Sequence, residues 1–178
     1  MMETQLTKDI KMALWRNTHK MGTYGCFEVT IGWNERVDYM TYDTKGVFRC
    51  YEVKVSKADF CSKCKHTFAG HYNYYAMPED VYEEVKEDIP PDIGVYVFRH
   101  KELYIAKKAK KRNVGNPEEL KNDIIRALSR EAAKTIENHD ELHIQKLNRE
   151  IGQLRRDKER YRQEYWHLRR KIEGKESE

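Results

Sequence analysis

Two short runs of the sequence place carboxylates and a lysine where neighbouring β-strands are expected. Asp38 lies in the first run, Glu52 and Lys54 lie in the second, and both runs are rich in β-branched and aromatic residues. Residues 44–46, Thr-Lys-Gly, separate them and are typical of a hairpin turn. Residues two apart on a strand point to the same face, so Glu52 and Lys54 project together. A suitable hairpin register brings Asp38 beside them.

This combination of side chains suits metal-dependent hydrolysis of phosphodiesters. Carboxylate oxygens are ligands for Mg²⁺, with Mn²⁺ as its expected substitute, and a lysine can orient or deprotonate a water and stabilise charge on a phosphate. The alternative is a structural salt bridge. Tyr51, Val53 and Val55 make the other face of the strand apolar, so the strand is expected to be central. Charges buried there are costly unless they pair or bind a metal.

The surrounding pattern predicts an α/β fold with a mixed central sheet flanked by helices. The hydrophobic spacing predicts helices at 5–18, 56–68 and 79–86, and strands at 27–31, 37–40, 48–55, 73–77, 94–98 and 103–106. Strands 48–55 and 73–77 are joined through a helix, so we expect them to be parallel.

The same residues resemble the PD-(D/E)XK nuclease superfamily, in particular MmcB-type DNA repair proteins and small phage-encoded members. The resemblance covers about residues 5–100. It rests on Arg36-Val37-Asp38, on 51–60 (YEVKVSKADF) and on 73–78 (NYYAMP). It implies a restriction-endonuclease-like sheet, with Mg²⁺ held by Asp38, Glu52 and the Val53 carbonyl and with Lys54 beside the attacking water.

Members of that superfamily often add an acidic residue from the first helix. The corresponding helix here offers only Asp9 and, at its edge, Glu3, so Glu28 on the next strand is the better-placed candidate ligand.

The resulting expectation is a Mg²⁺-dependent DNA endonuclease-like protein that acts in DNA repair, recombination or phage DNA processing. The alternative is a catalytically weak or inactive DNA-binding accessory protein whose helical tail oligomerises or recruits a partner.

Basic side chains supply candidate contacts to DNA phosphates. Residues 101–112 carry six basic side chains and one acidic one, which favours salt-sensitive phosphate binding. A solvated basic linker and simple turn-forming residues are the alternatives. The candidate nucleic-acid contacts are Lys57, Lys63, Lys65, His66, His71, Lys107, Lys108, Lys110, Lys111 and Arg112.

Three segments are expected along the chain: a nuclease-like domain at 1–112, a linker at 113–116, and a long helical, coiled-coil tail at 117–178. The tail has a heptad seam at Leu147, Ile151, Leu154, Lys158, Tyr161, Tyr165, Leu168 and Ile172. We expect a homodimer through residues 140–173, parallel in orientation, with an antiparallel pair, a trimer, a folded-back helix or a lone solvated helix as alternatives.

Bulk composition excludes some classes of protein. The 178 residues carry a net charge of +4 and are 39% hydrophobic and 36% charged, with no run long and apolar enough for a membrane span and no apolar signal segment. We therefore expect the cytoplasm of a bacterium or of a phage-infected host, reduced cysteines, and no small-molecule cofactor. Cys61 and Cys64 lack a second pair at zinc-site spacing, so no zinc is expected.

Overall fold

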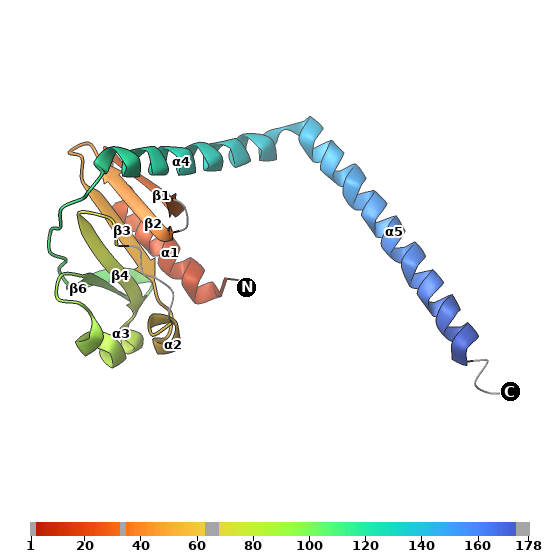
Figure 1. The fold of residues 1–178 in the computed structure, drawn as a ribbon, viewed down its shortest axis with the longest axis horizontal. Helices are drawn as coiled ribbons and strands as arrows, with labels where there is room; N and C mark the ends of the chain where they lie inside the picture. The colour runs from red at the N-terminus through yellow and green to blue at the C-terminus, as the bar shows by residue number, and fades with distance from the viewer. Residues whose placement is uncertain (1–2, 33–34, 63–67, 174–178) are drawn as a thin grey trace. The chain divides into compact units, whose positions relative to one another are not determined.

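A six-stranded mixed sheet organises the part of the chain that the computed structural model describes, residues 3–32, 35–62 and 68–173 (Figure 1). Its strands lie in chain order: β1 (Thr23–Ile31), β2 (Glu35–Asp43), β3 (Phe48–Val53), β4 (Tyr72–Pro78), β5 (Gly94–Arg99) and β6 (Glu102–Lys107). The β3–β4 and β4–β5 pairs are parallel, and the other neighbours are antiparallel.

Five α-helices and a short 3₁₀ helix occupy the same described ranges. They are α1 (Gln5–Thr18), α2 (Lys57–Phe60), α3 (Glu79–Val85), η1 (Lys86–Asp88), α4 (Pro117–His139) and α5 (Glu141–Glu173). Thr4 caps α1 by accepting a hydrogen bond from the Thr7 amide, as expected for a threonine at that position. None of these helices combines the length and apolar character that a membrane span requires.

The predicted α/β architecture and the parallel β3–β4 pair are confirmed. The helix predicted at 56–68 is shorter, because α2 ends at Phe60. Residues 63–67, which belong to the predicted helix, lie outside the described part. Strand β1 begins at Thr23 rather than at the predicted Phe27. Thr23 pairs with Asp43, the last residue of β2.

Each face of the sheet carries its own hydrophobic cluster because successive strand residues alternate sides. Helix α1 packs on one face, where Ile10 and Leu14 meet Tyr39 and Tyr51. On the other face, α3 and Phe60 of α2 cover β4 and β5.

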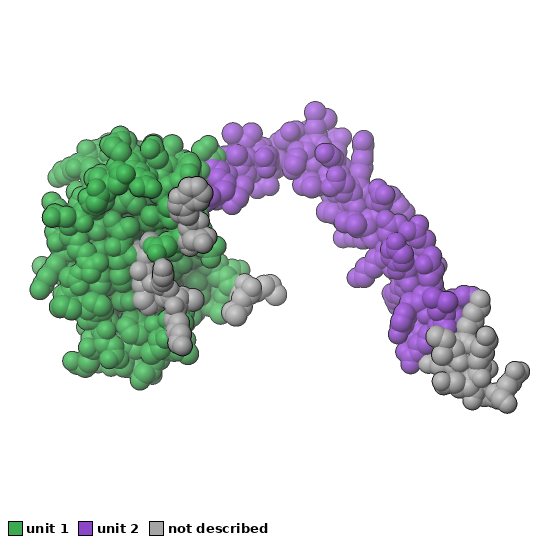
Figure 2. Space-filling view, in the orientation of Figure 1, with its two compact units in different colours: residues 1–129 green, residues 130–178 purple. Residues whose placement is uncertain are grey.

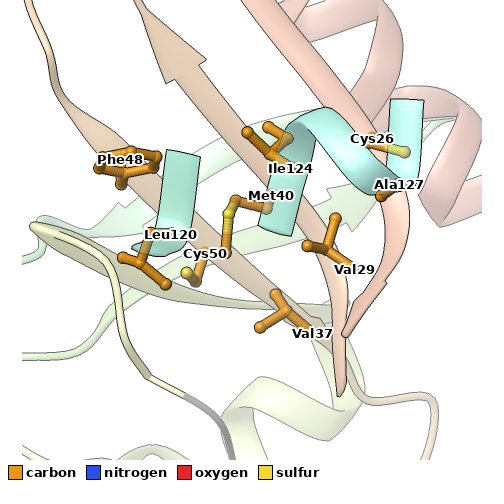
Figure 3. Packing of buried hydrophobic residues seen from close by; sticks show 9 residues of the cluster. All are labelled: Cys26, Val29, Val37, Met40, Phe48, Cys50, Leu120, Ile124 and Ala127. Atoms are coloured by element: carbon orange, nitrogen blue, oxygen red, sulfur yellow. The ribbon is translucent and has the colours of Figure 1, made fainter. Parts of the chain in front are cut away.

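Helix α4 covers the remainder of that second face, over β1, β2 and β3. Leu120, Ile124 and Ala127 pack there against six strand residues: Cys26, Val29, Val37, Met40, Phe48 and Cys50 (Figure 3). The carboxylate of Asp123, on the same stretch of helix, is buried; it pairs with Arg126 and accepts a long hydrogen bond of 3.4 Å from the Gly32 amide.

The chain divides into two compact units, Met1–Ser129 and Arg130–Glu178 (Figure 2). This division differs from the predicted linker at 113–116. The first part of α4 supplies buried core residues to the sheet, so the boundary falls within the helix. The long helical tail is broken at Asp140: α4 ends at His139, and Asp140 accepts a hydrogen bond from the Leu142 amide at the start of α5.

Candidate active site

Glu52 lies near the carboxyl end of β3 and Lys54 directly follows the strand, and each residue is only 6% exposed. Because both alternate with Val53, they point to the face of the sheet opposite α1. On the neighbouring strand, Tyr75 stands opposite Glu52. Burial, with a smaller contribution from the charge of Glu52, raises the pKa of Tyr75 to about 12. The Glu52 carboxylate therefore lies in a low-dielectric part of the sheet rather than on a solvated surface.

Asp38 meets this end of β3 where the β2–β3 ladder stops. The ladder runs as far as the pair Tyr39–Tyr51, and one further step in the same register puts Asp38 opposite Glu52. Past the end of the ladder, the Val53 amide donates a 2.8 Å hydrogen bond to Oδ2 of Asp38. The aspartate side chain thus takes the place of a strand carbonyl and is fixed against β3.

The environment of Asp38 disfavours its charged form. Burial is the largest influence and raises the pKa of Asp38 above its ordinary value. The Val53 hydrogen bond and the charges of Lys11 and Lys54 lower it, and Glu28 raises it. A half-buried carboxylate beside another carboxylate is stabilised by any added positive charge. This environment is typical of functional sites.

Lys54 is held from two sides. Its amide donates to the Ala76 carbonyl at 3.0 Å, and its Nζ lies 3.7 Å from Oδ1 of Asp59. Asp59 is itself fixed, because the Val55 amide donates to its Oδ2 and its own amide donates to Ser56 Oγ at the start of α2. The Ser56–Asp59 cap at the start of α2 thereby also positions the lysine.

Glu28, the predicted additional ligand, is bound by two cations. Lys11 Nζ lies 2.5 Å from Oε1 of Glu28, and Arg36 Nε lies 2.8 Å from Oε2. Lys11 also pairs with Glu3 at 2.8 Å. Glu28 has a positive φ of 54°. In the β1–β2 pairing, Phe27 pairs with Tyr39 and Val29 with Val37, so Glu28 and Asp38 between them are not paired. Strand β1 therefore bends at Glu28, and its side chain points toward the lysine of α1.

The oxygen donors suit a magnesium ion with a partly hydrated shell. In the described residues, no group of three or more His, Cys, Asp and Glu side chains stands close enough to hold a metal. Mg²⁺ needs only one or two protein carboxylates, because it keeps several waters. Asp38, Glu52 and the Val53 carbonyl would form such a set, with Glu28 outside it as long as it pairs with Lys11 and Arg36.

The predicted nucleic-acid contacts separate into two regions. Lys57 is exposed at the start of α2, near the carboxyl end of β3, whereas Lys63, Lys65 and His66 lie outside the described residues. His71 lies at the opposite end of β3, where its Nδ1 accepts a 3.0 Å hydrogen bond from the Phe48 amide. Burial, helped by Lys111 and Arg49, lowers the pKa of His71, so its ring is a neutral structural acceptor.

The basic segment 107–112 lies at the same end of the sheet as His71. Its Arg112 amide donates to the His71 carbonyl at 2.8 Å. Lys107 Nζ donates to the Ile89 and Pro90 carbonyls, and the Arg112 guanidinium pairs with Asp92. The exposed members of the segment are Lys108, Lys110 and Lys111. From Phe48 to Glu52 is about 13 Å along the strand, so these lysines and the carboxylates belong to different regions of the sheet.

Lys11 and Asp59 contact residues of the candidate site, and neither was predicted from the sequence to belong to it. Lys11 adjoins Ile10 on the buried side of α1. A lysine at the margin of an apolar stripe can lay its stem along the core and extend its amine to a partner, which is a signal available in the sequence. Burial acts to lower the pKa of Lys11, but the hydrogen bonds that its amine donates to Glu28 and Glu3, together with their charges, outweigh burial and raise the pKa.

No family model matches the chain, and no curated protein matches it. Among solved structures, the chain is similar to the SPO1766 protein of unknown function from Silicibacter pomeroyi, with a TM-score of 0.64 and 20% sequence identity. The match covers 78% of this chain and 94% of that chain. At this level of identity, the likeness concerns the fold alone.

Proposed function

We propose that this protein is a Mg²⁺-dependent DNA nuclease whose metal ligands are Asp38, Glu52 and the Val53 carbonyl. The single observation that carries the proposal is the hydrogen bond from the Val53 amide to Asp38. It fixes one carboxylate beside the strand position of the other, at a site where Lys54 is also buried.

Within this proposal, the bound metal supplies Lewis-acid polarisation of the phosphate and lowers the pKa of a water. Asp38 and Glu52 hold the metal in a fixed position, and the burial of Glu52 limits the access of bulk water. Lys54 orients the attacking water and stabilises the charge that develops on the phosphate. Asp59 keeps the lysine amine at the site and so acts as a positioning residue.

The activity test compares wild type with three near-isosteric variants on duplex, branched, nicked and single-stranded DNA, with Mg²⁺ or Mn²⁺. Asp38→Asn, Glu52→Gln and Lys54→Met are each expected to slow cleavage by about 10²–10³-fold, the loss typical when one stabilising group at a reacting centre is removed. Asp80→Asn, an exposed carboxylate on α3, is the matched control and is expected to cut like wild type. The proposal is contradicted if Asp38→Asn and Lys54→Met retain wild-type rates.

A second function, that of a DNA-binding accessory protein without nuclease activity, is favoured by the ion pairs of Glu28. Lys11 and Arg36 neutralise the carboxylate that would otherwise complete an acidic cluster. Calorimetry separates the two functions. The nuclease requires Mg²⁺ or Mn²⁺ binding that is lost in Glu52→Gln. The accessory protein shows no such binding and keeps its DNA affinity in EDTA.

A further inference from the structure

A polar cavity of about 250 Å³ lies on the α1 face of the sheet, near the amino end of β3. Its wall includes Lys20, Thr41, Asp43, Arg49, Tyr51 and Tyr96. Tyr51 packs in the α1-face cluster, whereas Glu52 belongs to the other face. The cavity is therefore separate from the proposed metal site, both along β3 and across the sheet.

Arg49 is held in a fixed position at this cavity. Its Nη1 bonds to Oδ2 of Asp43 at 2.8 Å, and its guanidinium lies 5.6 Å from the centre of the Tyr72 ring. Asp43 is fixed in turn by the amides of Lys45 and Val47. A guanidinium has five N–H donors, so the bond to Asp43 uses only part of its capacity. With Lys20 added, the wall carries two cations and one anion.

Hydroxyl donors complete the wall of the cavity. Tyr51 and the Thr41 side chain are each 1% exposed. Burial raises the pKa of both Tyr51 and Tyr96, while the charge of Arg49 lowers it in part. Their hydroxyls therefore stay protonated at neutral pH and can donate to an anion.

We propose that this cavity is a binding site for a phosphate monoester. A tetrahedral dianion offers several acceptor oxygens in different directions. It therefore matches a guanidinium, an ammonium and several hydroxyl donors better than a planar carboxylate ligand would. The volume lies just below the range of about 300–1,000 Å³ that is typical of drug-sized ligand sites. The ligand is therefore a small phosphate monoester, either a mononucleotide or the phosphorylated end of a nucleic acid, and inorganic phosphate is the smallest probe for it. This site is independent of the proposed nuclease function.

The test titrates the full-length protein with inorganic phosphate at constant ionic strength and follows backbone amide shifts by NMR. Binding is expected to move the amides of Lys20, Thr41 and Arg49. Arg49→Gln is expected to weaken binding at least tenfold. Arg99→Gln is the matched control, because Arg99 also pairs with a carboxylate, Glu79, and also covers a tyrosine ring; it is expected to bind like wild type.

Further arms of the titration identify the source of the phosphate. They use adenosine monophosphate, and a dinucleotide with either a 5′-phosphate or a 5′-hydroxyl. Tighter binding of the phosphorylated dinucleotide identifies a nucleic-acid end, and tighter binding of the mononucleotide identifies a nucleotide. The proposal is overturned if wild type shows no phosphate binding at tens of millimolar, or if the shifts fall on residues 107–112 instead. The wild-type shifts decide the question even if Arg49→Gln fails to fold.

Discussion

At the scale of single residues, strand alternation made the shared face of Glu52 and Lys54 predictable. The partners of Glu28 and the cavity at Arg49 depend on tertiary packing, which the sequence does not reveal. Glu52 and Lys54 alternate with apolar neighbours, and the structure buries both on one face, as that pattern predicts. The ion pairs of Glu28 were not predictable, because the two cations, Lys11 and Arg36, come from α1 and β2. Its positive φ was not predictable either, because a glutamate in a strand gives no sign of that backbone conformation. The cavity at Arg49 likewise draws on several separate segments of the chain.

Asp38 is expected to lower the stability of the folded protein at neutral pH. Its pKa is raised on folding, chiefly by burial. The stability associated with this group is therefore complete below its unfolded pKa and is lost as the pH rises through the folded pKa. Asp38→Asn keeps an oxygen for the Val53 amide and carries no charge. We expect it to unfold at higher urea than wild type at pH 7, with the difference vanishing below about pH 4.

Added Mg²⁺ provides the control for this prediction. It is expected to raise the urea midpoint of wild type and to leave that of Asp38→Asn unchanged, because a ligand that binds only the folded protein stabilises it. A less stable Asp38→Asn at pH 7 contradicts the inferred burial cost.

At the scale of the elements, the sequence located most strands and helices but not the partner of α4. The apolar stripe at Leu120, Ile124 and Leu128 fits equally well a tail helix or a helix that covers a sheet. The structure assigns it to the sheet, where Leu120 and Ile124 are 5% and 2% exposed. The start of α2 was predicted but its end at Phe60 was not, because capping signals mark where a helix begins better than where it ends.

Two adjacent isoleucines on α4 test its structural role. Ile124 is buried in the cluster with β1–β3, whereas Ile125 is 52% exposed. Ile124→Ala is expected to cost about 2–5 kcal/mol in the free energy of unfolding. Ile125→Ala, with the same chemical change on the same helix, is expected to stay within about 0.5 kcal/mol of wild type. Urea unfolding measures both, and equal effects would remove α4 from the core.

The segment 107–112 is expected to contribute to DNA binding through its exposed lysines alone. Lys107 and Arg112 already bind carbonyls and Asp92. Changing Lys108, Lys110 and Lys111 together to Gln is expected to weaken binding to all sequences alike and to lower the salt slope by about three. A control variant with Lys8, Lys86 and Lys134 changed to Gln should keep the wild-type slope. If both variants keep the wild-type DNA affinity and salt slope, the segment is a solvated linker that does not contact DNA.

At the scale of the whole molecule, an α/β unit ends within a helix whose remainder belongs to a second, helical unit. The seam of α5 is exposed along its described length: Leu147 is 43% exposed, Ile151 45%, Leu154 67% and Leu168 59%. The Ile172 side chain lies outside the described part. A helix with such a stripe has little to stabilise it alone in water, which supports the proposal of a homodimer through residues 140–173.

Light scattering of the full chain and of a chain that ends at Ser129 tests this assembly. At tens of micromolar, the full chain is expected to have the mass of a dimer and the shorter chain that of a monomer. Leu147→Asp and Leu154→Asp each remove about 1.5–3 kcal/mol of burial, so each is expected to raise the dimer dissociation constant by about tenfold or more. Gln153→Asp, outside the seam, should have little effect. A monomeric full chain rejects the dimer.

The cover that α4 lays over β1–β3 also has a consequence for oxidation. Cys26 and Cys50 are both enclosed beneath it, and burial raises the pKa of Cys50 to about 12, whereas Cys61 is exposed. Only the thiolate reacts readily with oxidants and alkylating agents. Cys61 is thus open to modification in the native protein, while Cys26 and Cys50 react only when their cover opens, and α4 is a main part of that cover. Their rates of labelling therefore record how often this side of the core opens.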